Sequence, residues 1–192
     1  MALYSIYAYG KKYRSIGYDK EQMFDDFGSS INHFDVNYSP RPFLADLKRP
    51  LKVNFSPESS AFSGDDIPDI SEHYGRLFLS VKAYDALKDL IKNDGEFLPI
   101  EYEKGAAYIF NTLSVAESVH GLNEQLSSKN EYGDRLSTAF HEDSVRGLMI
   151  FKTSYDGYIN AFIQEELKQA IEQAKLKGVY FTSELGIPSF NK

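Results

Sequence analysis

The chain has 192 residues, 42% of them hydrophobic and 26% charged, which is typical of one soluble globular domain with a substantial core. It has no cysteine, which excludes disulfides, a thiol nucleophile and cysteine-based metal centres. Its net charge of −7 disfavours binding to nucleic acids or anionic membranes and favours a basic partner. We expect a cytoplasmic protein, because no apolar run is long enough to span a bilayer and the first residues alternate like a strand rather than a signal peptide.

The first third of the chain combines short alternating stretches with a proline-rich loop. We expect a strand, its hairpin partner, a short helix and a later strand at Leu3–Tyr9, Lys12–Tyr18, Glu21–Phe27 and Leu51–Phe55. The hairpin would turn at Gly10-Lys11. Five of the seven prolines lie between residues 37 and 68, where they remove amide donors and fix φ. That stretch is therefore predicted to be mostly loop.

The most regular pattern runs from residue 76 to residue 120. After an apolar run, Ser80 suits the N-cap of an amphipathic helix, and Gly95 is expected to end that helix in the left-handed conformation. Ser114 and Glu117 have the spacing of a capping box for a second, short helix. Between the helices we expect two strands joined by a turn, at Glu96–Tyr102 and Ala106–Thr112. This stretch carries no motif of an active site, and we interpret it as scaffold.

The last third predicts two strands, the clearest helix of the chain and a final strand. Their expected bounds are Leu148–Lys152, Tyr158–Ile163, Gln164–Lys177 and Val179–Thr182. The helix carries an apolar stripe of Leu167, Ala170, Ile171 and Ala174, and Gly178 should end it. All elements together predict an α+β fold, with a mostly antiparallel sheet and interspersed amphipathic helices. We expect one compact domain, in which a loop-rich segment of residues 1–67 packs on a main body of residues 68–192.

Acidic and aromatic side chains gather in two stretches that could contact a basic partner. The first holds Asp65, Asp66, Asp69, Glu72 and Tyr74, and the second holds Glu142 and Asp143. Loops can vary without disturbing the core, so specificity for a partner is expected there. The three aspartates could alternatively surround a divalent cation. The loop lacks the alternation and the closing glutamate of a calcium loop, so we favour a solvated loop or a partner contact and predict no metal.

No pattern in the sequence indicates catalysis or a cofactor. The four histidines show no paired spacing, and a nucleophile elbow, a phosphate-binding glycine loop and a dinucleotide fingerprint are all missing from the sequence. Glu166-Leu167-Lys168 has the acidic-x-Lys spacing of some nucleases, but it lies on the expected amphipathic helix. We therefore predict no catalytic residue and no bound cofactor.

Residues 68–188 resemble a family of bacterial immunity proteins, immunity family eleven, formerly a domain of unknown function. Three features carry the resemblance, together with the strand at Leu148–Phe151: the segments PDISEHYGRLFLSVKAYDALKDL, GEFLPIEYEKGAAYIFNTLSVAESV and FIQEELKQAIEQAKLKGVYF. One departure lies in the short helix, where such families often carry a Leu-Asp pair and this chain has Ala116-Glu117-Ser118.

The resemblance implies an inhibitor that binds a cognate toxin and needs no catalysis. Such proteins are encoded beside toxin genes in polymorphic-toxin systems of competing bacteria, and many of the toxins are nucleases with basic clefts. An acidic inhibitor can complement such a cleft electrostatically. Two other hypotheses stay open at this point: an enzyme of unrecognised class, and an adaptor or structural protein without a toxin partner.

Overall fold

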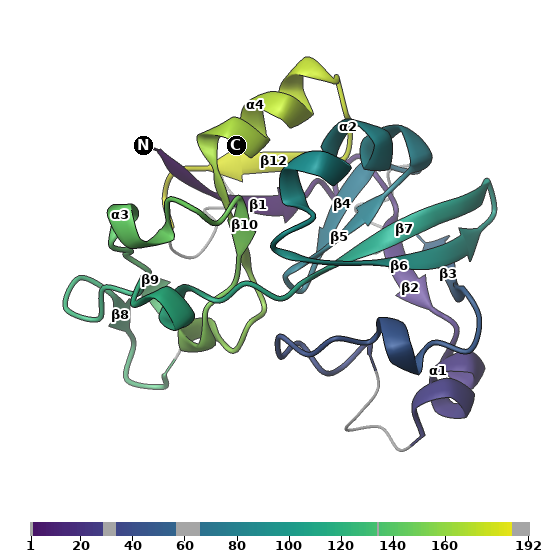
Figure 1. The fold of residues 1–192 in the computed structure, drawn as a ribbon, viewed down its shortest axis with the longest axis horizontal. Coiled ribbons are helices and arrows are strands. Elements are labelled where there is room, and N and C mark those ends of the chain that lie inside the picture. Colours follow the sequence, from purple (N-terminus) through teal and green to yellow (C-terminus); the bar gives the residue numbers. More distant parts are fainter. Residues whose placement is uncertain (1, 29–33, 57–65, 134, 186–192) are drawn as a thin grey trace.

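The computed structural model describes residues 2–28, 34–56, 66–133 and 135–185. These residues form an α+β fold of mostly antiparallel sheets, which confirms the predicted fold class. Figure 1 shows the two larger sheets in the body of the molecule, with helices α2 and α4 along one side and the short elements β8, β9 and α3 at one end. The helices α1 to α4 span Lys20–Phe27, Val81–Ile91, Glu142–Val145 and Glu165–Gln173.

The smaller of these two sheets has four strands in the order β10, β11, β1, β12, all antiparallel. Their bounds are Ile150–Phe151, Ala161–Gln164, Leu3–Ala8 and Val179–Thr182. Strand β1 pairs with β11 along one edge, where Leu3 lies opposite Gln164, and with β12 along the other, where Ala8 lies opposite Val179. The first strand of the chain thus lies between strands from its last quarter.

The larger sheet has six strands in the order β2, β3, β6, β7, β5, β4. Their bounds are Ser15–Tyr18, Leu51–Ser56, Gly95–Tyr102, Gly105–Thr112, Arg76–Leu79 and Ile70–His73. Strand β3 runs parallel to β6, and the other pairs of this sheet are antiparallel. Both larger sheets take strands from before and after residue 67, and the division of the chain at that residue stays a prediction.

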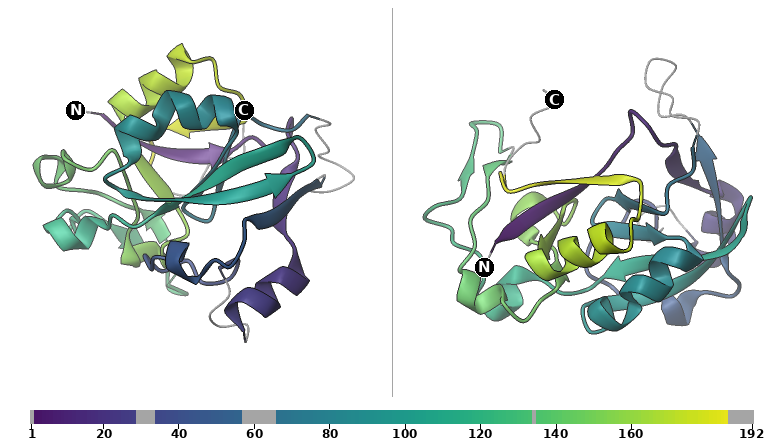
Figure 2. Two further views of the ribbon diagram at one scale, coloured as in Figure 1. Left: turned by 45° about the vertical axis from the view of Figure 1, so that its right-hand side comes forward. Right: turned by 90° about the horizontal axis from the view of Figure 1, so that it is seen from above.

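Helices α2 and α4 lie side by side against the main hydrophobic core (Figure 2). Leu167 and Ile171 of α4 are fully buried there, and Ala170 packs against the same core. The apolar stripe predicted from helical spacing therefore faces inward. The predicted cap of α2 is also confirmed, because the Ser80 hydroxyl accepts a hydrogen bond from the Ala83 amide at 3.3 Å.

Short elements complete the described chain. Three 3₁₀ turns, η2, η3 and η4, span Leu44–Asp46, Ala116–Val119 and Ser154–Asp156. Strands β8 and β9, at Ser128–Lys129 and Arg135–Ser137, form a small separate hairpin. The loop before η2 is buried on the sheet through Phe34 and Phe43, which are fully enclosed in a second core cluster.

The predicted hairpin between Leu3–Tyr9 and Lys12–Tyr18 is wrong. Residues 15–18 do form a strand, β2, but it pairs with β3 in the larger sheet, with Ser15 opposite Ser56. Both edges of β1 are already occupied by β11 and β12. Alternation marks a strand, but it carries no information on which distant strand will be its partner.

Two local signals around α2 and η3 were also misread. Gly95 begins β6 with an ordinary φ, and a Cβ there would lie 2.3 Å from the Asn111 carbonyl oxygen, so close backbone approach explains this glycine.

The predicted capping box is wrong, because the side chains of both residues form hydrogen bonds to residues that are distant in sequence. The Ser114 hydroxyl donates to Asp94 at 2.8 Å, and the Glu117 carboxylate accepts from the Thr153 hydroxyl.

Elements near the end of the chain are shorter than predicted. Helix α4 ends at Gln173, and Lys175 then adopts a φ of +51°, which helical residues do not have. Strand β11 starts at Ala161, because Tyr158 has a φ of +66° and lies in a turn. The expected final strand is present as β12 with the predicted bounds.

Candidate functional site

The acidic residues expected to contact a partner lie on separate elements. Asp65 is outside the described residues. Asp66 is exposed just before β4, whereas Glu142 and Asp143 are exposed in the first turn of α3. Asp143 forms an ion pair with Arg146 within that short helix. The second stretch is thus the start of a short helix rather than a loop.

Asp69 is bonded within the fold. Its carboxylate accepts a hydrogen bond from the Lys177 amide at 3.0 Å and pairs with the Lys82 ammonium at 3.4 Å. Its own amide donates to the Lys177 carbonyl at 2.8 Å. Asp69 thus fixes the start of β4 to the segment between α4 and β12 and to the start of α2.

Glu72 and Tyr74 lie together at the other end of β4, in the turn to β5. His73 pairs with Arg76, so Tyr74 and Gly75 form a two-residue loop. Their φ angles are +49° and +74°, as a type I′ turn requires at both positions. Asparagine, aspartate or glycine is the usual residue at the first of these positions, so a tyrosine there is conformationally unfavourable. The Glu72 carboxylate accepts from the Gly75 amide at 2.7 Å and closes the turn.

The side chain of a buried lysine packs against Gly75 of this turn. Lys152, at the end of β10, is fully buried, and its ammonium donates to the Tyr38 carbonyl at 3.0 Å. A Cβ on Gly75 would lie 2.7 Å from the Lys152 Cε and 2.7 Å from the Tyr158 carbonyl oxygen. Glycine is therefore required at residue 75 by space as well as by its positive φ.

We call the stacked rings of Tyr38 and Tyr74, together with the adjoining residues Tyr158 and Ile159, the tyrosine surface. The rings of Tyr38 and Tyr74 stack with centroids 4.5 Å apart. Tyr74 and Ile159 are 45% and 41% exposed, and Tyr38 and Tyr158 are partly exposed. Tyr158 has a positive φ as Tyr74 does, and its carbonyl oxygen lies beside Gly75. Three segments distant in sequence thus meet at this surface.

Arg76 positions the loop that carries Tyr38. It is 1% exposed, stacks on the Phe34 ring at 3.9 Å and donates to the carbonyls of Phe34 and Asn37 and to the Asn111 side chain. A buried guanidinium is tolerated because these acceptors replace water. Arg76 thereby holds residues 34–38 against β5 and β7.

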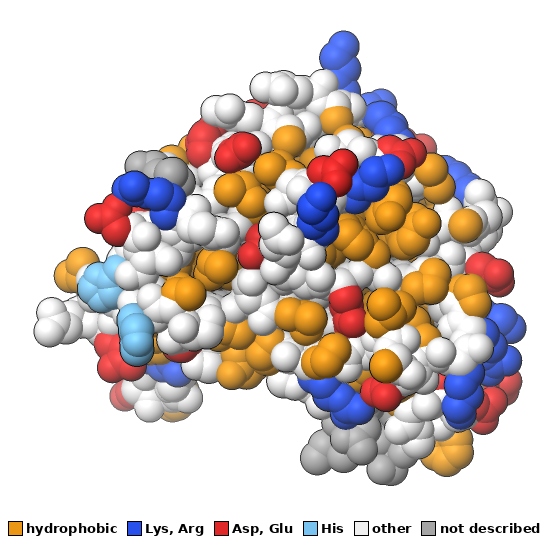
Figure 3. Space-filling model, viewed as in Figure 1, with side chains coloured by type: hydrophobic (Ala, Val, Ile, Leu, Met, Phe, Trp, Pro, Cys, Tyr) orange, Lys and Arg blue, Asp and Glu red, His pale blue; other side chains and the backbone are white. Residues whose placement is uncertain are grey.

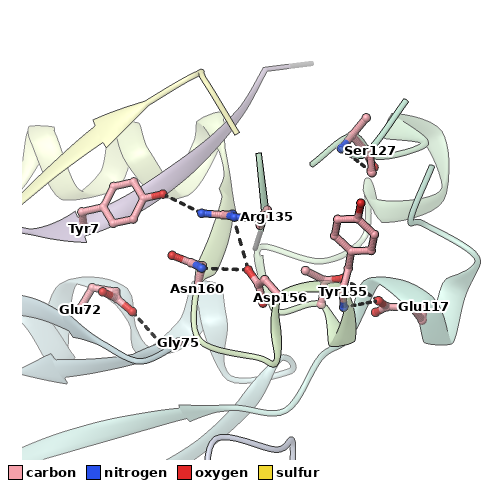
Figure 4. Close-up of polar contacts among 11 residues, drawn as sticks. Tyr7, Glu72, Gly75, Glu117, Ser127, Arg135, Tyr155, Asp156 and Asn160 are labelled. Atoms are coloured by element: carbon pink, nitrogen blue, oxygen red, sulfur yellow. Dashed lines mark hydrogen bonds and ion pairs between the residues drawn. The ribbon is translucent and has the colours of Figure 1, made fainter. Parts of the chain in front are cut away.

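A buried ion pair near Glu72 and Lys152 joins Asp156, on the segment that carries Tyr158, to Arg135. The Asp156 carboxylate accepts from the Asn160 amide at 2.9 Å and lies 3.5 Å from the Arg135 guanidinium, and both charged side chains are less than a tenth exposed. Arg135 also donates to the Tyr7 hydroxyl at 3.3 Å. Figure 4 shows Arg135 reaching between Tyr7 of β1 and Asp156 of η4. These contacts connect the turn after η4 to β1 and β9.

Burial shifts the pKa values of the charged groups under the surface. It raises the pKa of Glu72 to about 8, against the opposing effect of the Gly75 hydrogen bond. Burial, together with the charge of Arg76, lowers the pKa of Lys152 to about 7. The pKa of His73 falls to about 4, mainly through burial and then through Arg76. Burial likewise raises the pKa of Asp156.

The buried charges under the tyrosine surface were missed by reasoning from sequence. In the sequence, Arg76 and Lys152 lie only at the ends of predicted strands, and Asp156 lies in a predicted turn. A signal was available in two cases, because Arg76 and Lys152 directly flank apolar strands, where a cation must be bonded if it is buried. The partners of Arg76 and Lys152 lie 35 or more residues away in sequence and could not be inferred from spacing.

The residues around this turn are better suited to a rigid binding surface than to a catalytic site. Lys152 is the group with the most suitable shifted pKa for a base, yet it is fully buried and bonded to a carbonyl. In the described part of the chain, no group of three or more histidine, aspartate or glutamate side chains is placed to hold a metal ion. Asp65, one of the three aspartates that could surround a cation, lies outside the described residues.

A second apolar surface lies over α2 and the β6–β7 hairpin. Figure 3 shows apolar side chains gathered there, bordered by charges of both signs. Tyr84 stacks on Tyr108 at 3.9 Å, and Phe97 packs edge-on against Tyr84. These rings are only partly exposed and pack against the main core, so we interpret them as its outer edge.

No protein-family model matches the chain, and no curated protein matches it either. Among the described helices, none combines the length and apolar character needed to cross a bilayer.

Proposed function

We propose that the chain is an immunity protein, which binds one cognate bacterial toxin and neutralises it as a stoichiometric inhibitor without catalysis. The toxin would be a nuclease or another effector of competition between bacteria. The observation that carries the proposal is the tyrosine surface. Exposed tyrosines on a rigid, internally bonded support are the kind of residue that dominates protein–protein binding energy, because little entropy is lost when they are buried.

The charge of the chain supports a basic partner. A net charge of −7 attracts a cationic surface over several ångströms and raises the rate of association above that of uncharged encounters. The exposed acids Asp66, before β4, and Glu142 and Asp143, on α3, would contribute to this long-range field.

An enzyme of unrecognised class is the second candidate, and the shifted pKa of Lys152 is the observation in its favour. A catalytic lysine must reach its substrate, however, and Lys152 is fully enclosed. An adaptor without a toxin partner would use the same tyrosine surface, so only the identity of the partner separates it from an immunity protein.

Co-expression with the toxin encoded beside this gene tests the proposal. We expect cells that express the toxin to grow when they also express this chain, and the two proteins to purify together in a one-to-one complex. The association rate should fall as salt is added, because screening weakens the attraction between the charges. Cell death despite soluble immunity protein would contradict the function, whereas a salt-independent rate would contradict only the electrostatic part.

A further inference from the structure

We infer that the tyrosine surface is the face that contacts the toxin, and that it receives a segment of the toxin bearing arginine or lysine side chains. This inference rests on the proposed function and adds the location of the interface and the chemistry of the segment that occupies it.

The first argument is backbone strain. Of the four residues other than glycine with positive φ in the described chain, two are Tyr74 and Tyr158 of this surface. A bulky residue in this conformation is strained, and such strain is concentrated at functional sites. The fold does not need a tyrosine at residue 74, because asparagine fits the same turn with less strain. A role outside the fold explains why a ring is held there.

The second argument is that buried polar contacts hold the surface rigid. Each element that carries the surface is fixed by buried polar contacts: Arg76 holds the Tyr38 loop, Glu72 closes the Tyr74 turn, and Asp156 and Arg135 fix the turn before Ile159. Lys152 connects the first two, because it lies across Gly75 and donates to the Tyr38 carbonyl. A surface fixed in this way loses little conformational freedom on binding.

The third argument is charge. Two cations lie beneath this surface, Arg76 and Lys152, and they are 1% and 0% exposed, so a partner cannot contact their charged groups directly. Asp35 is partly exposed near Tyr38. Burial raises the pKa of the Tyr38 hydroxyl most, followed by Tyr74, and Asp35 adds a smaller effect that the charge of Arg76 opposes. Electron-rich ring faces beside a carboxylate attract guanidinium and ammonium groups. The acidic chain as a whole favours the same partner.

Binding measurements with the toxin encoded beside the gene test both parts of the inference. Tyr74→Asn removes the ring and keeps the turn, and Tyr132→Asn is its matched control on an 81%-exposed tyrosine of the β8–β9 loop. We expect Tyr74→Asn to weaken binding at least tenfold and Tyr132→Asn to change it less than twofold. Thermal unfolding of each free variant shows that the fold is retained.

Two further variants test the chemistry of the occupant. Tyr74→Phe keeps the π face and Tyr74→Leu keeps only apolar area, so a cationic occupant predicts that the phenylalanine variant binds at least fivefold more tightly than the leucine variant. Equal binding by these two variants would overturn the cationic occupant. Binding by Tyr74→Asn at the level of the wild type would overturn the interface and leave the proposed function intact. Absence of binding by the wild type would overturn both.

Discussion

The two tight hairpins of the larger sheet differ in how well their residues match their backbone. The β6–β7 hairpin turns at Glu103 and Lys104, neither of which has a positive φ, and its one left-handed residue is Gly105. The β4–β5 hairpin instead places Tyr74 in a conformation that favours asparagine or glycine. Natural sequences break such local rules mainly where function requires it. Under the proposed function, the β6–β7 hairpin serves the fold alone and the β4–β5 hairpin also carries a binding residue.

The two hairpins also differ in the sequence distance of their contacts. Residues 76–112 form β5, α2, β6 and β7, which are neighbours in the chain and in space. The tyrosine surface draws on residues 34–38, 72–76 and 152–160, which meet only in the folded protein. The first region can be recognised from local pattern, and the second cannot.

Disruption of the scaffold should have the largest effect on stability. Leu167→Asp places a charge at a fully buried position of α4, and burying an unpaired charge should cost about 4 kcal/mol or more. A typical domain has only about 5–15 kcal/mol of stability, so the variant should be largely unfolded at moderate temperature. Gln169→Asp on the exposed side of the same helix is the control and should cost about 1 kcal/mol or less. If chemical denaturation finds the two variants equally stable, the packing of α4 described above is wrong.

Removal of Asp94 should have the next largest effect, because this side chain joins the local scaffold to β10. It is 4% exposed and accepts hydrogen bonds from the Ser114 hydroxyl and the Met149 and Ile150 amides. Asp94→Ala leaves these donors unpaired and should cost about 3 kcal/mol in urea unfolding.

Asp89→Ala is the matched control for Asp94→Ala. Its carboxylate is 82% exposed and pairs only with Lys92 on the surface of α2. Pairs of this kind contribute about 0.5 kcal/mol or less. A similar loss of stability in the two variants would show that the Asp94 contacts do not hold β10 in place.

The fold was largely predictable because its strongest signals are local. Helix α2 was recognised from the spacing of its apolar residues and from Ser80, and α4 from its buried stripe. The errors occurred where a residue has a distant partner. Ser114 and Glu117 looked like a capping box, but they bond to Asp94 and Thr153, and β2 pairs with β3 rather than with β1.

The candidate site was predictable only in part. Glu72 and Tyr74 were selected because they are acidic and aromatic, and the structure places them together at one turn. Nothing in their neighbourhood in the sequence points to Tyr38, Lys152 or Tyr158, because these residues arrive from other segments. A positive φ at a tyrosine is also invisible in sequence, since local propensity predicts the opposite.

The pH dependence of stability should distinguish the site from the scaffold. Burial raises the pKa of Glu72 to about 8 in the folded state, from 4.5. Between these values the folded protein holds a proton that the unfolded chain has lost, so the contribution of Glu72 to stability falls as pH rises from about 4.5 to 8. Glu72→Gln cannot titrate. We expect the unfolding free energy of the wild type, minus that of this variant, to decline over this range, as measured by urea unfolding at several pH values.

Lys152 should give the opposite slope at higher pH. Its pKa is lowered to about 7 in the folded state from 10.5, so the unfolded chain binds more protons between these values and stability rises with pH there. Lys152→Met should remove that rise.

The Glu72 prediction has its own contradicting outcome. If the stability of Glu72→Gln itself declines below pH 8 as much as that of the wild type, other groups, such as Asp156, cause the decline.

Tyr74→Asn should have the smallest effect on stability, although it changes the site most. The substitution loses the stacking of Tyr74 on Tyr38, an interaction worth about 0.5–1.5 kcal/mol. It also relieves a tyrosine from a left-handed conformation that costs about 1 kcal/mol or more and that asparagine tolerates. The two effects have opposite signs, so we expect the free energy of unfolding to change by less than about 1 kcal/mol. Glu103→Asn, in the turn without positive φ, gains no such relief and serves as the control. A loss of more than about 2 kcal/mol in Tyr74→Asn would mean that the ring is part of the core, and that the contrast between the two hairpins has been misread.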